Sequence, residues 1–158
     1  MACFAGLQAA TDVVVCFMDC DASLDPEALP FVAGYVIRGE CDLAVGQRVA
    51  HRGAWPSHAR VANRILAAAV RRRTGLHLAD LGPMRAARRL DLLALELRDR
   101  RSAWPLEMVL CAHDAGCRIR NVPVEYRERQ GRSKVTGTVR GTWRAVGDMS
   151  RLLHARRR

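Results

Sequence analysis

Lysine and aromatic residues are scarce in this chain of 158 residues. Aromatic residues make up 5% of the sequence, so the core must be aliphatic. Lys134 is the single lysine among 26 basic residues. No apolar run reaches the roughly 18 residues of a membrane-spanning helix. The first ten residues lack the basic start and cleavage site of a signal peptide. We therefore expect a cytoplasmic chain, or one that rests on the inner face of the plasma membrane.

Several signatures of known site types are also missing. The six cysteines show no C-x-x-C spacing, and the five histidines are scattered, which argues against a zinc site or a Ser-His-Asp triad. We interpret the cysteines as reduced thiols of the core. No G-x-G-x-x-G or Walker A pattern is present, which disfavours dinucleotide and P-loop chemistry.

The length fits one domain, and 49% hydrophobic with 27% charged residues is typical of a folded globular chain. The net charge of +10 is uneven: residues 1–50 carry −5 and residues 51–158 carry +15. Such a basic part is either a solvated surface or a face for the phosphates of a nucleotide, a lipid headgroup or a nucleic acid. Nucleic acid is not an expected partner, because no aromatic platforms alternate with the arginines.

Apolar patterning predicts an α/β domain. A run without alternation at 13–18 indicates a central strand covered on both faces, and a helix at 25–38 and a strand at 41–46 would complete a βαβ unit. Further helices are expected at 57–73, 90–97 and 105–115, a strand at 118–124, a loop at 127–134, and a basic helix at about 138–155.

Two aspartates follow the first predicted strand. Because residues i and i+2 of extended chain point to the same side, Asp19 and Asp21 can face one point beyond the carboxyl end of the sheet. Two such oxygen ligands suit Mg²⁺ or Mn²⁺ together with a substrate diphosphate. A surface turn before an acidic helix start is the alternative.

Two basic segments could meet phosphates. The loop around Gly131 contains guanidinium groups, a hydroxyl and the lone lysine, which together suit phosphate oxygens unless the loop is merely solvated. These candidates are Arg127, Arg129, Arg132, Ser133 and Lys134. The helix at 57–73 is basic and amphipathic, and its face is either solvated or rests on anionic headgroups. Its arginines are Arg60, Arg64, Arg71, Arg72 and Arg73. Asp80 and Glu107 have the spacing of helix caps.

The order of these motifs resembles family 2 glycosyltransferases, and in particular the polyprenol-phosphate sugar transferases similar to dolichol-phosphate mannosyltransferase. The resemblance covers nearly the whole chain. It is carried by the segments Asp12–Asp21, Asp25–Glu27, Asp42–Arg48, Asp80–Arg85, Trp104–Met108 and Val122–Gly137.

The resemblance implies a GT-A, Rossmann-like three-layer sandwich with a mostly parallel sheet. It begins inside the helix before the D-x-D strand, so we expect a single partial domain over 1–158 that lacks the first βα units, and no strong activity from this chain alone. The implied reaction is an inverting transfer of a hexose from a UDP-glucose-like donor to a polyprenyl phosphate or similar acceptor. A nucleic-acid-binding module or a silent membrane-surface scaffold is the alternative, and the oligomeric state stays open.

The resemblance also implies residue roles. Asp19 and Asp21 would hold the Mg²⁺ or Mn²⁺ ion, and Arg48 would lie at the donor diphosphate. The loop of Arg127, Arg129, Arg132, Ser133 and Lys134 would close over the phosphates of donor and acceptor. Glu107 or Asp80 would act as the base for a hydroxyl acceptor, although Met108 stands where many members keep Asp. An anionic lipid phosphate would need positioning more than deprotonation.

Overall fold

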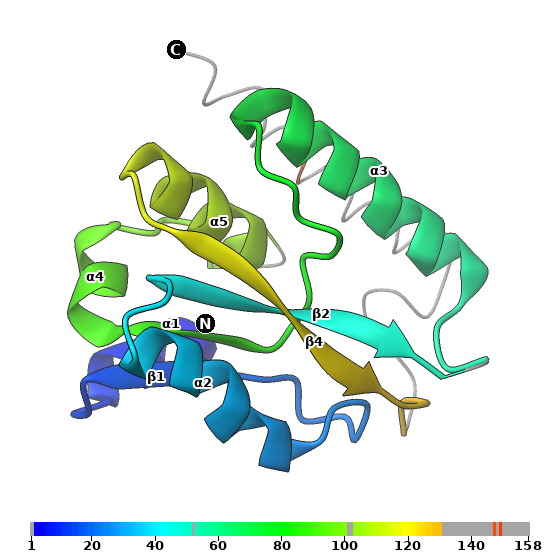
Figure 1. Ribbon diagram of the computed structural model, residues 1–158, viewed down its shortest axis with the longest axis horizontal. Helices are drawn as coiled ribbons and strands as arrows, with labels where there is room; N and C mark the ends of the chain where they lie inside the picture. The colour runs from blue at the N-terminus through cyan, green and yellow to red at the C-terminus, as the bar shows by residue number, and fades with distance from the viewer. Residues whose placement is uncertain (1, 52, 101–102, 131–146, 148, 150–158) are drawn as a thin grey trace.

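The computed structural model describes residues 2–51, 53–100, 103–130, 147 and 149. Within them, one four-stranded sheet lies between helices (Figure 1). The strands are β1 (Val14–Phe17), β2 (Leu43–Ala50), β3 (Arg85–Arg88) and β4 (Ile119–Tyr126). The helices are α1 (Ala2–Ala9), η1 (Pro26–Ala28), α2 (Leu29–Ile37), α3 (Ser57–Thr74), α4 (Arg89–Ala94) and α5 (Trp104–Asp114). Apart from residues 147 and 149, the helix predicted at about 138–155 lies outside the described residues.

The sheet has the strand order β1-β3-β2-β4. β3 is antiparallel to both of its neighbours, whereas β2 and β4 are parallel, so β1, β2 and β4 all run in one direction. The predicted α/β class is confirmed. The expectation of a central first strand is wrong for the described sheet: β1 pairs only with β3, no other described strand reaches its outer edge, and Val13 is 73% exposed.

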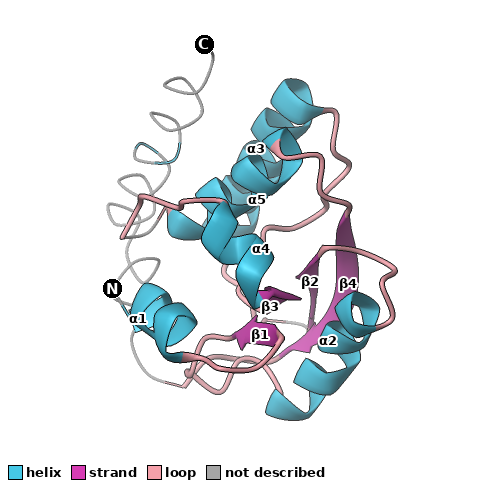
Figure 2. Ribbon diagram, turned by 90° about the vertical axis from the view of Figure 1, so that its left-hand side faces the viewer, coloured by secondary structure: helices cyan, strands magenta, loops and turns pink. Residues whose placement is uncertain are grey.

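Two apolar cores cover the two faces of the sheet, because successive strand residues point to opposite sides. One core joins the sheet to α1, α4 and α5, and the other joins it to α2 (Figure 2). On the first face lie Val15, Leu43, Val45 and Ala87, and on the second lie Ala44, Ala86, Val122 and Val124. The result is the expected three-layer arrangement.

The helix boundaries follow local capping signals. Asp25 Oδ1 accepts the Glu27 backbone N–H at 3.0 Å, and Pro26 opens η1, which continues into α2. Gly39 lies just past the end of α2 with a φ of +69°, a conformation that glycine adopts without steric cost. The helix predicted at 25–38 is therefore confirmed as η1 followed by α2, and α3 matches the helix predicted at 57–73.

Two expectations need correction. β3 was not predicted, because its sequence Arg-Ala-Ala-Arg lacks the β-branched and aromatic residues typical of strands. The cysteines form no disulfide with one another, but they are not all core thiols: Cys41 and Cys111 are buried, whereas Cys3, Cys16 and Cys20 are exposed. Cys16 lies on the edge strand β1.

Candidate active site

The predicted site residues gather at one edge of the sheet. The carboxyl ends of β1, β2 and β4 meet there, as does the amino end of the antiparallel β3. Asp19 follows β1, Arg48 lies on β2, Arg129 follows β4, and Arg85 begins β3. In α/β sheets this edge is where ligands bind.

Asp19 and Asp21 converge on one guanidinium group. Arg129 Nη2 forms an ion pair with Asp21 Oδ2 and lies 3.9 Å from Asp19 Oδ2. Asp21 Oδ1 also accepts hydrogen bonds from the Ser23 backbone N–H, at 3.0 Å, and from the Ser23 hydroxyl. Asp19 is partly buried, with 56% of its side chain exposed. The predicted convergence of the D-x-D pair therefore exists, and a cationic group lies between the two carboxylates.

The two carboxylates have opposite pKa shifts. Desolvation raises the pKa of Asp19, and the negative charge of Asp21 adds to that rise, against the opposing charges of Arg129, Arg48 and Arg85. Desolvation would also raise the pKa of Asp21, but hydrogen bonds from Ser23 and the positive charge of Arg129 outweigh it and lower that pKa. Asp21 is thus the firmly ionised member of the pair.

The segment after β4 runs beside the D-x-D loop. The Gln130 N–H donates to the Asp21 carbonyl at 2.9 Å, and the Arg127 N–H donates to the Ser23 carbonyl at 2.8 Å. The Arg127 guanidinium pairs with Glu125 and Asp25. The predicted loop is confirmed over 127–130. Three of its candidates lie outside the described residues, namely Arg132, Ser133 and Lys134.

Asp80 is not a helix cap, because β3 follows it rather than a helix. Its carboxylate accepts three hydrogen bonds from Arg48: from the backbone N–H at 2.9 Å, from Nε at 2.8 Å and from Nη2 at 2.8 Å. The Arg48 guanidinium also stacks 3.9 Å from the ring centre of Trp55. Asp80 is the buried partner of the pair. The structure therefore places the predicted diphosphate ligand Arg48 and the candidate base Asp80 in mutual contact.

The loop that carries Asp80 is fixed from several sides. Asn121 accepts the Ala79 N–H at 2.8 Å and donates to the Asp80 carbonyl at 3.2 Å. A Cβ atom added to Gly82 would lie 1.8 Å from the Gly46 carbonyl oxygen. Only glycine permits this approach of the loop to β2, which explains Gly82.

Arg85 is a buried residue of the site that the sequence analysis did not select. Its guanidinium donates to the carbonyls of Leu81 at 3.1 Å, Gly82 at 3.1 Å and Pro105 at 2.5 Å. Burial lowers the pKa of Arg85 to about 10, so it stays charged at neutral pH. Arg85 thus joins the Asp80 loop to the start of α5. The sequence signal that could have indicated Arg85 is its position at the end of the Asp80–Arg85 segment, which carries part of the family resemblance.

Glu107 lies in the first turn of α5, as its spacing predicted, but it caps a different segment. Its Oε2 accepts the backbone N–H groups of Arg98, at 3.0 Å, and Asp99, at 2.7 Å, in the loop before α5. The side chain is buried. In this arrangement Glu107 fixes the loop that leads into the helix.

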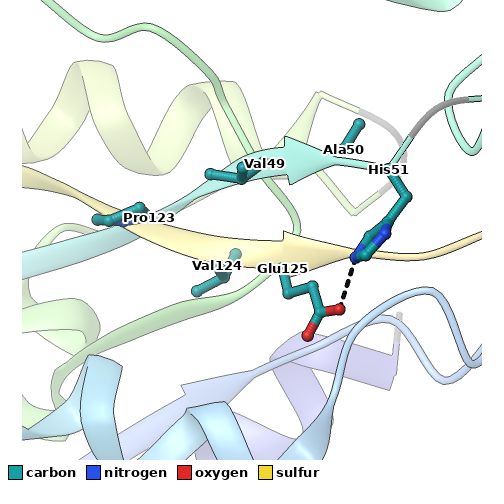
Figure 3. A pocket seen from close by; sticks show the side chains of 6 residues that line it. All are labelled: Val49, Ala50, His51, Pro123, Val124 and Glu125. Atoms are coloured by element: carbon teal, nitrogen blue, oxygen red, sulfur yellow. Dashed lines mark hydrogen bonds and ion pairs between the residues drawn. The ribbon is translucent and has the colours of Figure 1, made fainter.

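A shallow pocket lies at the ends of β2 and β4 and contains none of the predicted site residues (Figure 3). Val49, Pro123 and Val124 form its apolar lining. His51 Nε2 lies 2.6 Å from Glu125 Oε1 at its rim.

The five candidate arginines for contact with a membrane surface all lie on α3, as predicted: Arg60, Arg64, Arg71, Arg72 and Arg73.

The D-x-D carboxylates could hold a divalent cation. Both already face the cationic Nη2 of Arg129, a position that a metal ion could take in its place. Within the described residues, no third His, Cys, Asp or Glu completes a ligand cluster. An ion at this position would therefore take its other ligands from water or from a bound diphosphate, as Mg²⁺ commonly does.

Comparison with known proteins identifies the family of the chain. Residues 2–94 match the family model of glycosyl transferase family 2. Uncharacterized glycosyltransferases of Mycobacterium bovis and Mycobacterium tuberculosis are 39% identical over 151 residues, which cover 94% of this chain and 69% of each relative.

Two solved structures share the fold. Both are of glucosyl-3-phosphoglycerate synthase from Mycobacterium tuberculosis, one with phosphoglyceric acid (TM-score 0.68, 23% identity) and one with Mn²⁺, UDP-glucose and phosphoglyceric acid (TM-score 0.63, 24% identity). Each match covers 98% of this chain and 51% of the solved chain, so this chain spans about half their length. The fold, the order of the motifs and the family match lead to one conclusion: the chain belongs to glycosyl transferase family 2.

Proposed function

We propose that this chain binds the diphosphate of a nucleotide sugar through a divalent cation and transfers the hexose, with inversion, to an acceptor that carries a phosphate. The observation that supports the proposal most strongly is the convergence of Asp19 and Asp21 on one nitrogen of Arg129. A cation held by both carboxylates would stand at the edge of the sheet where α/β proteins bind ligands. Bound there, Mg²⁺ or Mn²⁺ would neutralise the charge of the departing nucleoside diphosphate.

Arg129 then has a second role in this proposal. Its Nε is buried and has no hydrogen-bond partner among the described residues. When an ion takes the position between the aspartates, the guanidinium can turn toward a phosphate oxygen, which it would bind with two N–H groups. Arg132, Ser133 and Lys134, which lie outside the described residues, would supply further phosphate contacts. Arg48, whose guanidinium is held by Asp80, would contribute positive charge near the diphosphate.

The contacts of the two candidate bases favour a phosphate acceptor. Asp80 is occupied by Arg48, and Glu107 accepts two backbone N–H groups. A phosphate monoester has a second pKa of about 6 and is already anionic at neutral pH, so it needs no base. A polyprenyl phosphate presents such a phosphate oxygen as its only nucleophile, whereas the phosphoglyceric acid of the solved relative also carries a hydroxyl group, whose attack would need a base. We propose a UDP-hexose donor, because the same relative was solved with UDP-glucose.

The test of donor binding is calorimetric titration of UDP with and without Mn²⁺. We expect Mn²⁺ to strengthen UDP binding in the wild type and to have no effect in Asp21→Asn. Arg129→Gln separates two contributions: it should strengthen binding of Mn²⁺ alone, because a competing cation is removed, and weaken binding of UDP with Mn²⁺. Asp42→Asn, which loses an exposed ion pair with Arg118, is the matched control. A UDP affinity that changes neither on addition of Mn²⁺ nor in Asp21→Asn would contradict the proposal.

The acceptor test follows hexose transfer from UDP-glucose to three acceptors: phosphoglycerate, a short polyprenyl phosphate and the corresponding polyprenol. Transfer to the polyprenyl phosphate but not to the polyprenol supports a phosphate oxygen as the nucleophile. Transfer to phosphoglycerate alone supports a small acid acceptor, and the position of the new bond, on the phosphate or on the hydroxyl, shows whether a base is needed. Transfer to the polyprenol alone would contradict the proposed acceptor class. A hydroxyl acceptor needs a general base, and Glu107 or Asp80 would then be the candidate.

A further inference from the structure

The outward side of α3 exposes apolar residues among arginines. Val61 and Ile65 are 52% and 51% exposed, whereas Ala67 and Val70 on the opposite side are buried. On the same helix, Leu66 and Ala69 pack against the core, whereas Val61 and Ile65 do not. Five arginines and no acidic residue occur in the 18 residues of the helix.

These residues form one continuous surface. With 3.6 residues per turn, Val61 and Ile65 lie in one row, Arg72 continues that row, and Arg60, Arg64 and Arg71 form the row beside it. We call these six residues the α3 outer face. Figure 1 shows α3 at the periphery of the molecule, away from β1 and α2.

Among the described residues, nothing compensates the positive charge of the α3 outer face. Arg60, Arg64, Arg71 and Arg72 form no side-chain hydrogen bond or ion pair with the part of the chain that the structure describes. Other exposed arginines do find acids: Arg38 and Arg120 pair with Glu40, and Arg118 pairs with Asp42. Four arginines that have no partner in the described ranges surround two apolar side chains, and such a surface suits an external anion.

We propose that the α3 outer face docks on an anionic lipid surface. The arginines would meet the phosphate headgroups, and Val61 and Ile65 would enter the boundary between headgroups and acyl chains. The helix would lie on the bilayer, since no described helix is long and apolar enough to cross one. This inference does not depend on the proposed transferase activity.

Other occupants fit this surface less well. A second copy of the chain would bring two uncompensated arginine rows together. A nucleic acid would pair with the arginines but leave Val61 and Ile65 without apolar contact, and the outer face offers no aromatic ring on which bases could stack. An anionic membrane satisfies both the charge and the apolar side chains.

Sedimentation with vesicles tests the proposal on the full chain. We expect the wild type to bind phosphatidylcholine vesicles that contain phosphatidylglycerol and not those of phosphatidylcholine alone, and to be released by salt. Each arginine near an anionic surface strengthens binding about fivefold. Replacing Arg60, Arg64, Arg71 and Arg72 by Gln should therefore lower the partition coefficient by more than about tenfold. The matched control is Gln at Arg38, Arg88, Arg98 and Arg120, which removes the same charge elsewhere and should lower it far less.

A second variant tests the apolar contact. Val61→Ser with Ile65→Ser removes exposed apolar groups, so the fold should persist while vesicle binding falls several-fold. Circular dichroism of every variant confirms the fold. Equal losses in the outer-face and control variants would overturn the proposal, because net charge alone would then explain binding. Unchanged vesicle binding in the serine variant, or a wild type that binds single-stranded RNA but not the anionic vesicles, would overturn it as well.

Discussion

Arg48 and Asp80 form a two-pronged ion pair that joins β2 to the loop before β3. Arg48 Nε lies 2.8 Å from Asp80 Oδ2, and Nη2 lies 2.8 Å from Oδ1. The side chains are only 17% and 3% exposed, respectively. Planar, paired hydrogen bonds of this kind give both strength and a fixed orientation. The pair therefore determines where the Asp80 loop lies at the edge of the sheet.

Asp80→Asn should destabilise the fold. The amide cannot accept on both of its atoms, and it leaves the Arg48 charge without its partner in a mostly buried position. Breaking such a pair costs about 3 kcal/mol of unfolding free energy. Urea unfolding followed by circular dichroism measures the change. Asp42→Asn, which weakens a more exposed pair with Arg118, should lower the midpoint much less. Equal midpoints for Asp80→Asn and the wild type would show that the pair does not support the loop.

Gly82→Ala should also destabilise the fold, through overlap with the backbone. The added Cβ would lie 1.8 Å from the Gly46 carbonyl oxygen, and backbone on both sides limits relaxation. We expect a loss of about 3 kcal/mol. Gly6→Ala is the matched control: nothing lies within 4 Å of its Cβ, and it is inside α1, where alanine stabilises a helix by about 0.5–1 kcal/mol. A tolerated Gly82→Ala would show that the loop can move away from β2.

Local patterns predicted the elements of this site better than the contacts between them. The apolar run of β1 and the helical spacing of α3 are local signals, and both elements were found where they were expected. The partner of Asp80 is Arg48, 32 residues earlier in the chain, so local spacing suggested a helix cap instead. Arg85 was overlooked for a similar reason, because its acceptors are backbone carbonyls on a loop and a helix that only the fold brings together.

The strand β3 shows how tertiary structure overrides propensity. Arg85–Arg88 contains two alanines and two arginines, which predict no strand on their own. The segment is extended because it pairs with β1 and β2 at once, and Ala86 and Ala87 fit the two faces of the closely packed sheet. By contrast, the predicted convergence of Asp19 and Asp21 is observed although β1 ends at Phe17, before both aspartates.

Removing one carboxylate at a time should have opposite effects on the stability of the metal-free chain. The pKa of Asp19 is raised in the folded chain, so the ionised carboxylate is less favourable there than in the unfolded chain. Its ionisation therefore lowers the free energy of unfolding as the pH rises through the folded pKa. Asp19→Asn should raise the melting temperature at pH 7, because it removes this unfavourable charge. The pKa of Asp21 is lowered, so its contribution is present above the usual Asp pKa and is lost as the pH falls through the folded value. Asp21→Asn should therefore lower the melting temperature at pH 7.

Melting curves from pH 3 to pH 8 without divalent ions measure these effects. The difference between Asp21→Asn and the wild type should shrink as the pH falls below the usual Asp value of 3.8. Adding Mn²⁺ at pH 7 should stabilise the wild type more than either variant, because both carboxylates must be ionised to hold the ion. The same change in melting temperature for both variants would contradict the opposite electrostatic environments of the two aspartates.

Glu107 offers a direct choice between a structural and a chemical role. Glu107→Gln keeps a side-chain oxygen for the N–H groups of Arg98 and Asp99, so the fold should persist. Glu107→Ala leaves two partly buried donors without this acceptor and should cost about 2 kcal/mol. If the acceptor is a phosphate, Glu107→Gln should retain most of the transfer rate, and Glu107→Ala should lose activity together with stability. The measurement is the initial rate of hexose transfer beside urea unfolding of the same samples. A Glu107→Gln variant that folds normally and has lost transfer across the whole pH range would assign Glu107 as the base, since the amide preserves the loop contacts and removes only the ability to accept a proton.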